Sequence, residues 1–186
     1  MIVTFEHHSD LSAYSSGVPI GGQFAQEKGW SHLCFVSEHL DWFRDPYVIR
    51  NFDGLIDDGF SDQLDDVIYY GCYACGYAAA AYSFSYPMAT IIAINPQATL
   101  NPSIASWDKR FKHTRRQDFT TRFGYAPKMS EAPRMVLYFM TRKAPKNAIQ
   151  AALFQGENVT HLHNSVKSVD AAEFFRRRVF CPRLRP

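Results

Sequence analysis

The residues with the clearest chemical potential lie in one turn, residues 71–76, which reads Gly-Cys-Tyr-Ala-Cys-Gly. The apolar run 67–70 before it is typical of a buried strand, and the alanine-rich run 77–84 after it predicts a helix. A side chain at the apex of such a turn is presented at the end of the strand. A phenol there can donate a hydrogen bond or act as a general acid, whereas a thiol can act as a nucleophile or a redox group.

Steric crowding decides which residue of this turn stands at the apex. A sharp strand-to-helix turn strains its central residue and brings together the positions two before and two after it, so both must be small. Tyr73 is flanked by Gly71 and Cys75, which are both small. Cys72 would have a tyrosine at one of these positions, and Cys75 would have tyrosines at both. The sequence therefore predicts Tyr73 at the apex.

Strands and helices alternate around this turn, which predicts βαβ units and an α/β fold. We expect an open, mostly parallel sheet of five to six strands with helices on both faces, in a three-layer αβα arrangement. Ligands of such sheets bind beyond the carboxyl ends of the strands. The other expected strands are 2–5, 33–37, 89–94, 135–140 and 158–162, and the other expected helices are 47–59, 146–154 and 169–179. Residues 9–22 are interpreted as a loop, and residues 95–133 as an irregular segment with one short helix near 105–112.

Composition limits the class of protein. The chain of 186 residues predicts one domain over 1–178, followed by a basic C-terminal tail, 179–186. Hydrophobic residues make up 46% and charged residues 20%, as in a globular protein, and the net charge of +2 does not favour nucleic-acid binding. The start has no leader-like apolar run, and we expect no membrane span. Four cysteines in such a chain indicate a cytoplasmic protein, and a homo-oligomer is compatible with these features.

The turn resembles that of compact members of the α/β-hydrolase superfamily. Their nucleophile elbow reads roughly Tyr-Gly-Ser-Ser-Met-Gly-Gly-Tyr-Ala-Ala and is followed by a strand and Ser-Pro-Gln. Here the matching residues are 70–79, and the following strand ends in Asn-Pro-Gln, residues 95–97. The likeness runs from residue 33 to about 175 and implies a minimal hydrolase fold without a large lid. The chain departs from the family where its nucleophilic serine falls on Tyr73 and its second elbow glycine on Cys75.

The resemblance implies a degenerate triad around that tyrosine. Asn147 falls where the family has its acid, and His163 falls where the family has its histidine, expected beyond the last strand. The anion hole would consist of the backbone amide of Ala74 and those of Glu6 and His7, after the first strand. An asparagine can orient a histidine but supplies no charge.

Trp42 and Gln97 are expected to shape a pocket at this edge, although packing of Trp42 in the core explains it equally well. The basic segment 109–122 could bind phosphate or an anionic glycan, but a solvated connection is the simpler interpretation. We expect no metal and no cofactor.

Three functions follow from these residues. The favoured one is a hydrolase-like protein with a non-standard or degenerate triad that acts on, or binds, a small ester, acyl or glycan-linked substrate. A phenol has a pKa near 10 and rarely carries acyl groups, so loss of the ordinary hydrolase reaction is expected. The second is a thiol–disulfide redox protein using Cys72 and Cys75. The third is a binding or assembly module that kept the scaffold and lost the chemistry.

Overall fold

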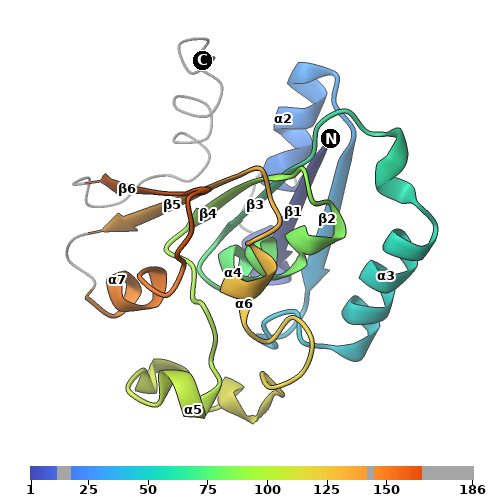
Figure 1. Cartoon of the computed structure of the whole chain (residues 1–186). Coiled ribbons are helices and arrows are strands. Elements are labelled where there is room, and N and C mark those ends of the chain that lie inside the picture. Colours follow the sequence, from blue (N-terminus) through green and yellow to red (C-terminus); the bar gives the residue numbers. More distant parts are fainter. Residues whose placement is uncertain (12–17, 142–144, 165–186) are drawn as a thin grey trace.

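The computed structural model describes residues 1–11, 18–141 and 145–164. Its centre is one open sheet in which all the strands are parallel, in the order β2-β1-β3-β4-β5-β6 (Figure 1). The predicted α/β fold with an open parallel sheet is confirmed. The strands are β1 (Ile2–His7), β2 (His32–Ser37), β3 (Ile68–Cys72), β4 (Thr90–Ile94), β5 (Met135–Thr141) and β6 (Val159–Asn164).

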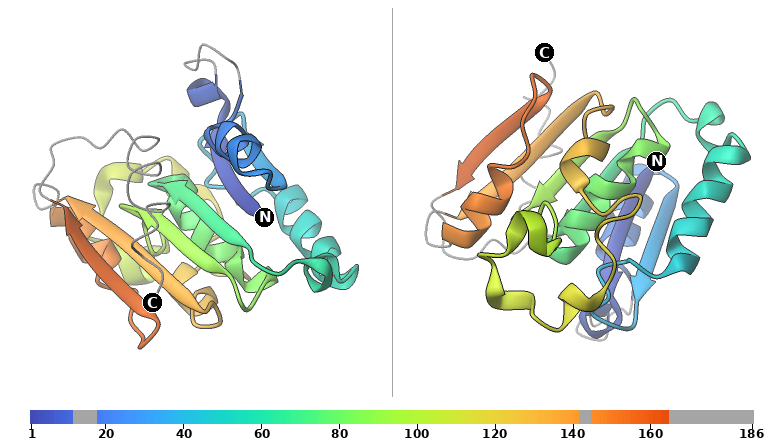
Figure 2. Two further views of the ribbon diagram at one scale, coloured as in Figure 1. Left: turned by 90° about the horizontal axis from the view of Figure 1, so that it is seen from above. Right: turned by 60° about the horizontal axis from the view of Figure 1, so that its bottom comes forward.

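Helices lie on both faces of this sheet. On one face α2 (Ile20–Lys28) packs against β1 and β2. On the other, α4 (Ala74–Tyr82) packs against β1, β3 and β4, and α7 (Pro145–Ala151) packs against β5. Figure 2 shows α3 (Pro46–Asp57) at the β2 end of the sheet and α7 at the β6 end. The short helices are α1 (His8–Leu11), α5 (Pro102–Ala105) and α6 (Ala126–Met129), with 3-10 turns at Phe60–Gln63, Ser83–Ser85, Lys109–Phe111 and Thr114–Arg116.

Aromatic rings join α3 and α4 to the sheet. Phe52 of α3 stacks on Phe35 of β2 and on Tyr82 of α4, with ring centroids 4.5 and 4.3 Å apart. Helix α3 can begin where it does because Pro46 occupies its first turn and the Asp45 side chain accepts from the Tyr47 amide at 2.7 Å. The stack fixes the two helices on one face of the sheet and buries Phe52 completely.

The predicted loop over 9–22 is wrong at both ends, since α1 extends to Leu11 and α2 begins at Ile20, while residues 12–17 lie outside the described ranges. The two glycines of α2, which suggested a loop, instead allow close packing on the sheet. A Cβ at Gly21 would lie 2.4 Å from Cγ2 of Thr4 and 2.6 Å from Nε2 of His32. The helix ends at Gly29 in the left-handed conformation, φ 67°, as expected for a C-terminal glycine.

Other boundaries also move. Strand β3 continues to Cys72 and α4 begins at Ala74, so the six-residue turn expected at 71–76 contracts to a single residue. Strand β1 continues to His7, two residues beyond its expected end. The short helix expected near 105–112 is replaced by α5 and a separate 3-10 turn. The helix expected at 169–179 and the tail at 179–186 lie outside the described residues.

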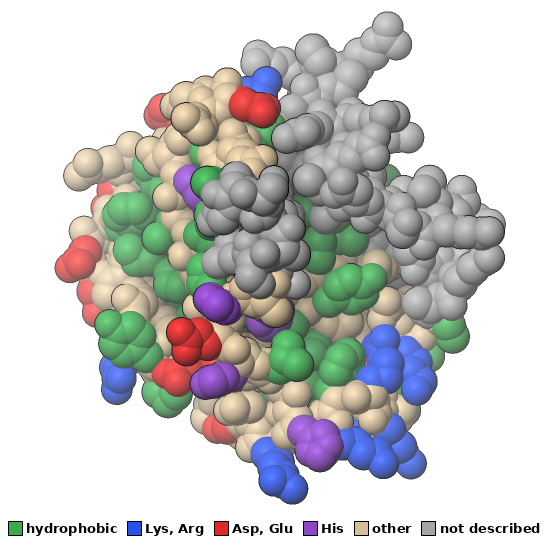
Figure 3. Space-filling model, turned by 180° about the vertical axis from the view of Figure 1, so that it is seen from behind, with side chains coloured by type: hydrophobic (Ala, Val, Ile, Leu, Met, Phe, Trp, Pro, Cys, Tyr) green, Lys and Arg blue, Asp and Glu red, His purple; other side chains and the backbone are tan. Residues whose placement is uncertain are grey.

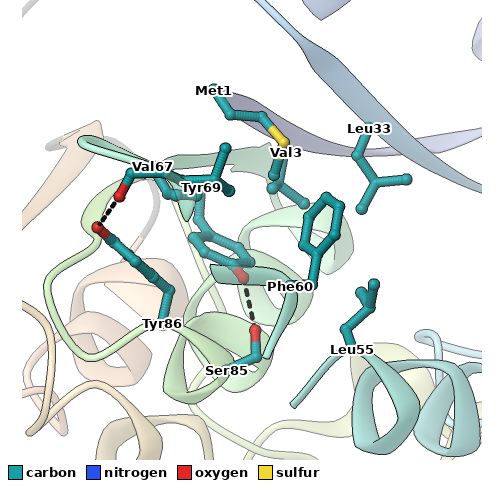
Figure 4. A pocket seen from close by; sticks show the side chains of 10 residues that line it. Met1, Val3, Leu33, Leu55, Phe60, Val67, Tyr69, Ser85 and Tyr86 are labelled. Carbon is teal, nitrogen blue, oxygen red and sulfur yellow. Dashed lines mark hydrogen bonds between the residues drawn. The ribbon is translucent and has the colours of Figure 1, made fainter. Parts of the chain in front are cut away.

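A small apolar cavity lies at the amino ends of the strands, between the sheet and α3 (Figure 4). Its volume is about 10 Å³, which is room for about one water molecule. Tyr69 is one of the lining residues, and its hydroxyl lies 2.6 Å from Oγ of Ser85 (Figure 4). Because ligands of parallel sheets bind at the carboxyl ends, this cavity belongs to the core.

Candidate functional site

Tyr73 is the only residue between β3 and α4, and its backbone is strained. Its dihedral angles are φ 52° and ψ −116°, outside the regions that non-glycine residues prefer. Two hydrogen bonds hold it there: its amide donates to the carbonyl of Ile94 at 2.8 Å, and its carbonyl accepts from the Tyr77 amide at 2.9 Å. The predicted turn with Tyr73 at the apex is confirmed. The side chain is 55% exposed, so the phenol projects from the end of the sheet.

Two glycines make this turn possible. A Cβ added to Gly71 would lie 2.2 Å from the carbonyl oxygen of Cys75, closer than any real contact allows. A Cβ on Gly76 would lie 3.1 Å from the carbonyl oxygen of Gly71 and 3.4 Å from Cα of Pro96. The strand end, the start of α4 and the end of β4 are therefore packed backbone to backbone, which explains why the flanking positions must be small.

The sheet changes its winding direction beside Tyr73. Strand β1 leads through α2 on one face, whereas β3 leads through α4 on the other, so their connections diverge. The paired residues of β1 and β3 end at Thr4 and Tyr70, although both strands continue further. This is the topological switch point, where open parallel sheets open a crevice for ligands. Tyr73 stands at its edge.

The start of α4 adds a positive potential at this point. The first amides of an α-helix, including that of Ala74, have no acceptor within the helix, and no side chain caps α4. Tyr73 and the amides behind it therefore offer donors on the same side of the crevice.

The other expected anion-hole residues lie inside strand β1. Glu6 and His7 pair in register with Val36 and Ser37 of β2, so they do not form a loop. The Glu6 side chain is buried, and the His7 ring packs on Phe43 with centroids 5.7 Å apart. Nε2 of His7 is buried and has no hydrogen-bond partner among the described residues. By extension of the register, His7 is the described imidazole that lies level with Tyr73 on the neighbouring strand.

Polar side chains surround the ends of β1 and β2. His8, Glu38 and His39 are exposed after these strands, and Figure 3 shows histidine side chains beside acidic ones on this side of the molecule. The turn after β2 is ordered by Asp41, whose Oδ1 accepts from Oγ of Ser37 at 2.8 Å and from the Phe43 amide at 2.9 Å. These groups can contact a polar ligand in the crevice.

Trp42 and Gln97 are buried close to this edge rather than presented to solvent. Trp42 is 2% exposed and packs edge-on against Tyr77 and Phe111, at 5.7 and 4.9 Å between centroids. Gln97 is fully buried, and its Nε2 donates to the carbonyl of Asn95 at 3.2 Å. For Trp42 the structure favours the interpretation as core packing, and Gln97 is likewise part of the interior.

Arg44 holds residues 118–122, the segment that covers Trp42. This role of Arg44 was not predicted from the sequence. Arg44 is buried, and its guanidinium donates to the carbonyls of Asp118 and Arg122, each at 2.9 Å, and to Oγ1 of Thr121 at 3.0 Å. The guanidinium also lies over the Phe119 ring, 5.8 Å from its centroid. No sequence pattern distinguishes a single arginine after a strand, so only the fold shows this role.

Asn147 is held by an arginine. It is buried in α7, and its Oδ1 accepts from Nη1 of Arg110 at 2.6 Å. Arg110 also forms an ion pair with the buried carboxylate of Asp108 at 2.7 Å, and Asp108 accepts from Nε2 of Gln150 at 3.2 Å. The basic segment is therefore tied to the protein interior here. An acidic residue just before a basic run was the signal available in the sequence.

Asp108 is expected to make stability depend on pH. Burial alone would raise the pKa of this carboxyl, but hydrogen bonds from Arg110 and Gln150 outweigh it and hold the pKa below its usual value. A carboxyl whose pKa is lower in the folded than in the unfolded state stabilises the protein at pH values above its unfolded-state pKa, which is near 4. This stabilisation is lost as the pH falls through the folded-state pKa. Asp108→Asn should thus lower the free energy of unfolding by about 2 kcal/mol at pH 7, with the difference from wild type shrinking below about pH 4.

Urea unfolding at pH 7, 5 and 3 measures this difference. The matched control is Asp66→Asn, because Asp66 is 81% exposed and lies 3.9 Å from Arg134, too exposed a pair to matter. An Asp108→Asn variant as stable as wild type at pH 7 would show that the Arg110 network contributes nothing.

His163 lies in strand β6, not beyond it, opposite Met140 of β5. The expected position after the last strand is therefore wrong. The register places its backbone level with Tyr73, but β4 and β5 lie between, a separation of roughly 14 Å at about 4.8 Å per strand. Its side chain lies outside what the structure describes.

Cys72 and Cys75 lie on opposite sides of the sheet. Sγ of Cys72 is 3.5 Å from the hydroxyl of Tyr70, on the face away from α4, whereas Cys75 is buried within α4. Neither residue is in a disulfide bond. This arrangement does not favour a disulfide between them.

Within the ranges that the structure describes, no three histidine, cysteine or acidic side chains are grouped so as to hold a metal ion. Nor is any helix there both long enough and apolar enough to span a membrane. No family model, no curated protein and no solved structure matches the chain.

Proposed function

We propose that the chain is a hydrolase-like protein with a degenerate triad, which binds or acts on a small ester, acyl or glycan-linked substrate at the crevice between β1 and β3. The strained backbone of Tyr73, between a central parallel strand and a buried helix, carries this proposal. In α/β-hydrolases a residue held in this way is the nucleophile, and an amide just after it helps to bind the oxyanion. The resemblance in sequence thus has a matching local geometry.

The chemistry assigned to Tyr73 is hydrogen-bond donation. Its exposed phenol donates towards a carbonyl or leaving-group oxygen, and the Ala74 amide donates to the same ligand. The aromatic ring also offers a flat surface for an acyl chain or a sugar ring. His163 is the proposed base, taking a proton from the attacking water, and Asn147 is its proposed orienting residue.

Hydrolysis of 4-nitrophenyl acetate tests this function. The wild-type protein should hydrolyse the ester faster than buffer, and Tyr73→Phe should lower that excess rate by about 100-fold, the usual loss when one donor to the developing oxyanion is removed. His163→Ala should lower it to a similar extent. Since the Tyr73 side chain is exposed, Tyr73→Phe should leave the melting temperature unchanged.

Tyr47→Phe is the matched control, because Tyr47 is 67% exposed on α3 and should not affect the rate. An excess rate that survives Tyr73→Phe would refute the site. A wild-type protein that binds the ester's acyl product without turnover, in a manner lost in Tyr73→Phe, would instead identify the binding module.

A further inference from the structure

A groove lies between β2 and α3 at the outer edge of the sheet. It is separate from the crevice proposed between β1 and β3. Its volume is about 460 Å³. The floor is apolar, made by Leu33 and Phe35 of β2 and Leu55 of α3. The groove opens beside the edge of β2, which pairs with β1 alone among the described strands.

Strand β2 lacks the features that protect an edge. Its sequence, His-Leu-Cys-Phe-Val-Ser, contains no lysine, no acidic residue and no proline, and Val36 is 42% exposed. Edge strands of soluble proteins usually carry such residues because unpaired backbone groups otherwise recruit another strand. An unprotected edge beside an apolar groove indicates a docking surface.

The charges on α3 indicate which kind of partner fits the groove. One face of the helix lines the groove, with Arg50 before Gly54 and Asp58 after it at equal spacing of four residues. The last turn of α3 has no basic residue although it ends in Asp57 and Asp58, an unfavourable charge at a helix C-terminus. Neither Arg50 nor Asp58 forms an ion pair within the described part of the chain.

A second copy of the chain, related by a two-fold axis, would offer charges that are complementary to these. If two α3 helices cross antiparallel at Gly54, Arg50 of each faces Asp58 of the other, and Asn51 faces Asp57. Gly54 permits this close crossing, since a Cβ there would have nothing within 4 Å. Leu33 and Phe35 line the same groove as Gly54, so one axis running between the two α3 helices and between the two β2 edges would pair these edge strands antiparallel.

We propose that the β2–α3 edge binds a second copy of this chain, forming a symmetric dimer with one sheet continuous across both subunits. Backbone hydrogen bonds between the β2 strands give affinity, the apolar groove is covered, and reciprocal Arg50–Asp58 pairs fix the register. This inference is independent of the activity proposed for Tyr73.

Sedimentation equilibrium with charge-reversed variants tests the interface. Wild type should sediment at twice the chain mass of 21.3 kDa. Arg50→Asp and Asp58→Arg should each raise the dissociation constant by at least about 10-fold, because each places like charges together. The double variant should restore it to within about 3-fold of wild type, since the pairs reform with reversed sign.

Two further variants keep the outcome decisive. Lys128→Asp makes the same charge change on an exposed residue of α6, remote from the groove, and should not affect association. Gly54→Glu fits the open space of the single subunit but places two carboxylates at the axis, so it should give a folded monomer. A monomeric wild type, a dimer indifferent to both single reversals, or a double variant that stays dissociated would each overturn the proposal.

Discussion

Replacing Gly71 with alanine is expected to lower the free energy of unfolding by about 3 kcal/mol and the melting temperature by roughly 6–12 °C. The added methyl group would stand 2.2 Å from the carbonyl oxygen of Cys75 and 2.8 Å from the amide nitrogen of Gly76. Both contacts are backbone atoms, which cannot move aside as a flexible side chain can. The start of α4 must shift to make room, and Tyr73 would shift with it. Thermal and urea unfolding followed by circular dichroism measure the loss.

The control for this substitution is Gly54→Ala in α3. A Cβ there meets nothing within 4 Å within the subunit. In an Arg50→Asp background, where the proposed dimer contact at Gly54 is weakened, alanine should therefore stabilise the subunit by about 0.5–1 kcal/mol through its higher helix propensity. If Gly71→Ala were as stable as wild type, the backbone-to-backbone packing at the turn would be wrong, and with it the strained position of Tyr73.

Arg44→Met is also expected to lower the free energy of unfolding, by about 3–4 kcal/mol. Methionine fills a similar volume but leaves the part-buried carbonyls of Asp118 and Arg122 without their donor. The segment containing Phe119 would loosen above Trp42, so we also expect faster proteolytic cleavage there. Urea unfolding and limited proteolysis measure the two consequences.

Arg44→Lys separates charge from geometry. Lysine keeps the charge but cannot reach three acceptors in one plane, so it should recover only part of the lost stability. Arg116→Met provides the control, because Arg116 is exposed and its loss should leave unfolding unchanged. Equal stability of Arg44→Met and wild type would show that the guanidinium does not hold this segment.

Local rules predicted much of the sheet because a strand buried on both faces is a continuous apolar run. Ile91 and Ile92 of β4 are both buried, although their side chains point to opposite faces. Helix α2 was not predicted, because local sequence rules do not favour a helix there. Its glycines lower helix propensity, and what stabilises it is close contact with Thr4 and His32, which sequence neighbours cannot reveal.

The candidate site was predictable where sterics alone decide. Two small residues around Tyr73 sufficed to place it at the apex, because the contact between Gly71 and Cys75 is local in sequence. The surroundings of Asn147 were not predictable, since Arg110 lies 37 residues away and reaches it only after the irregular segment has folded. His163 was misplaced because nothing local marks the end of β6.

Helix α4 has no solvent-facing side, since all nine of its residues are buried. The hydroxyl groups of Tyr77 and Tyr82 connect the helix to the loops that cover it, since they donate to the carbonyls of Phe123 and Phe43, each at 2.6 Å. Burial raises the pKa of both phenols. The amides beyond the first turn of the helix should therefore exchange with deuterium only when the whole domain unfolds. Tyr73 directly precedes this buried helix, so its position is fixed before a ligand binds. A ligand at this site must therefore adapt its own conformation to the protein.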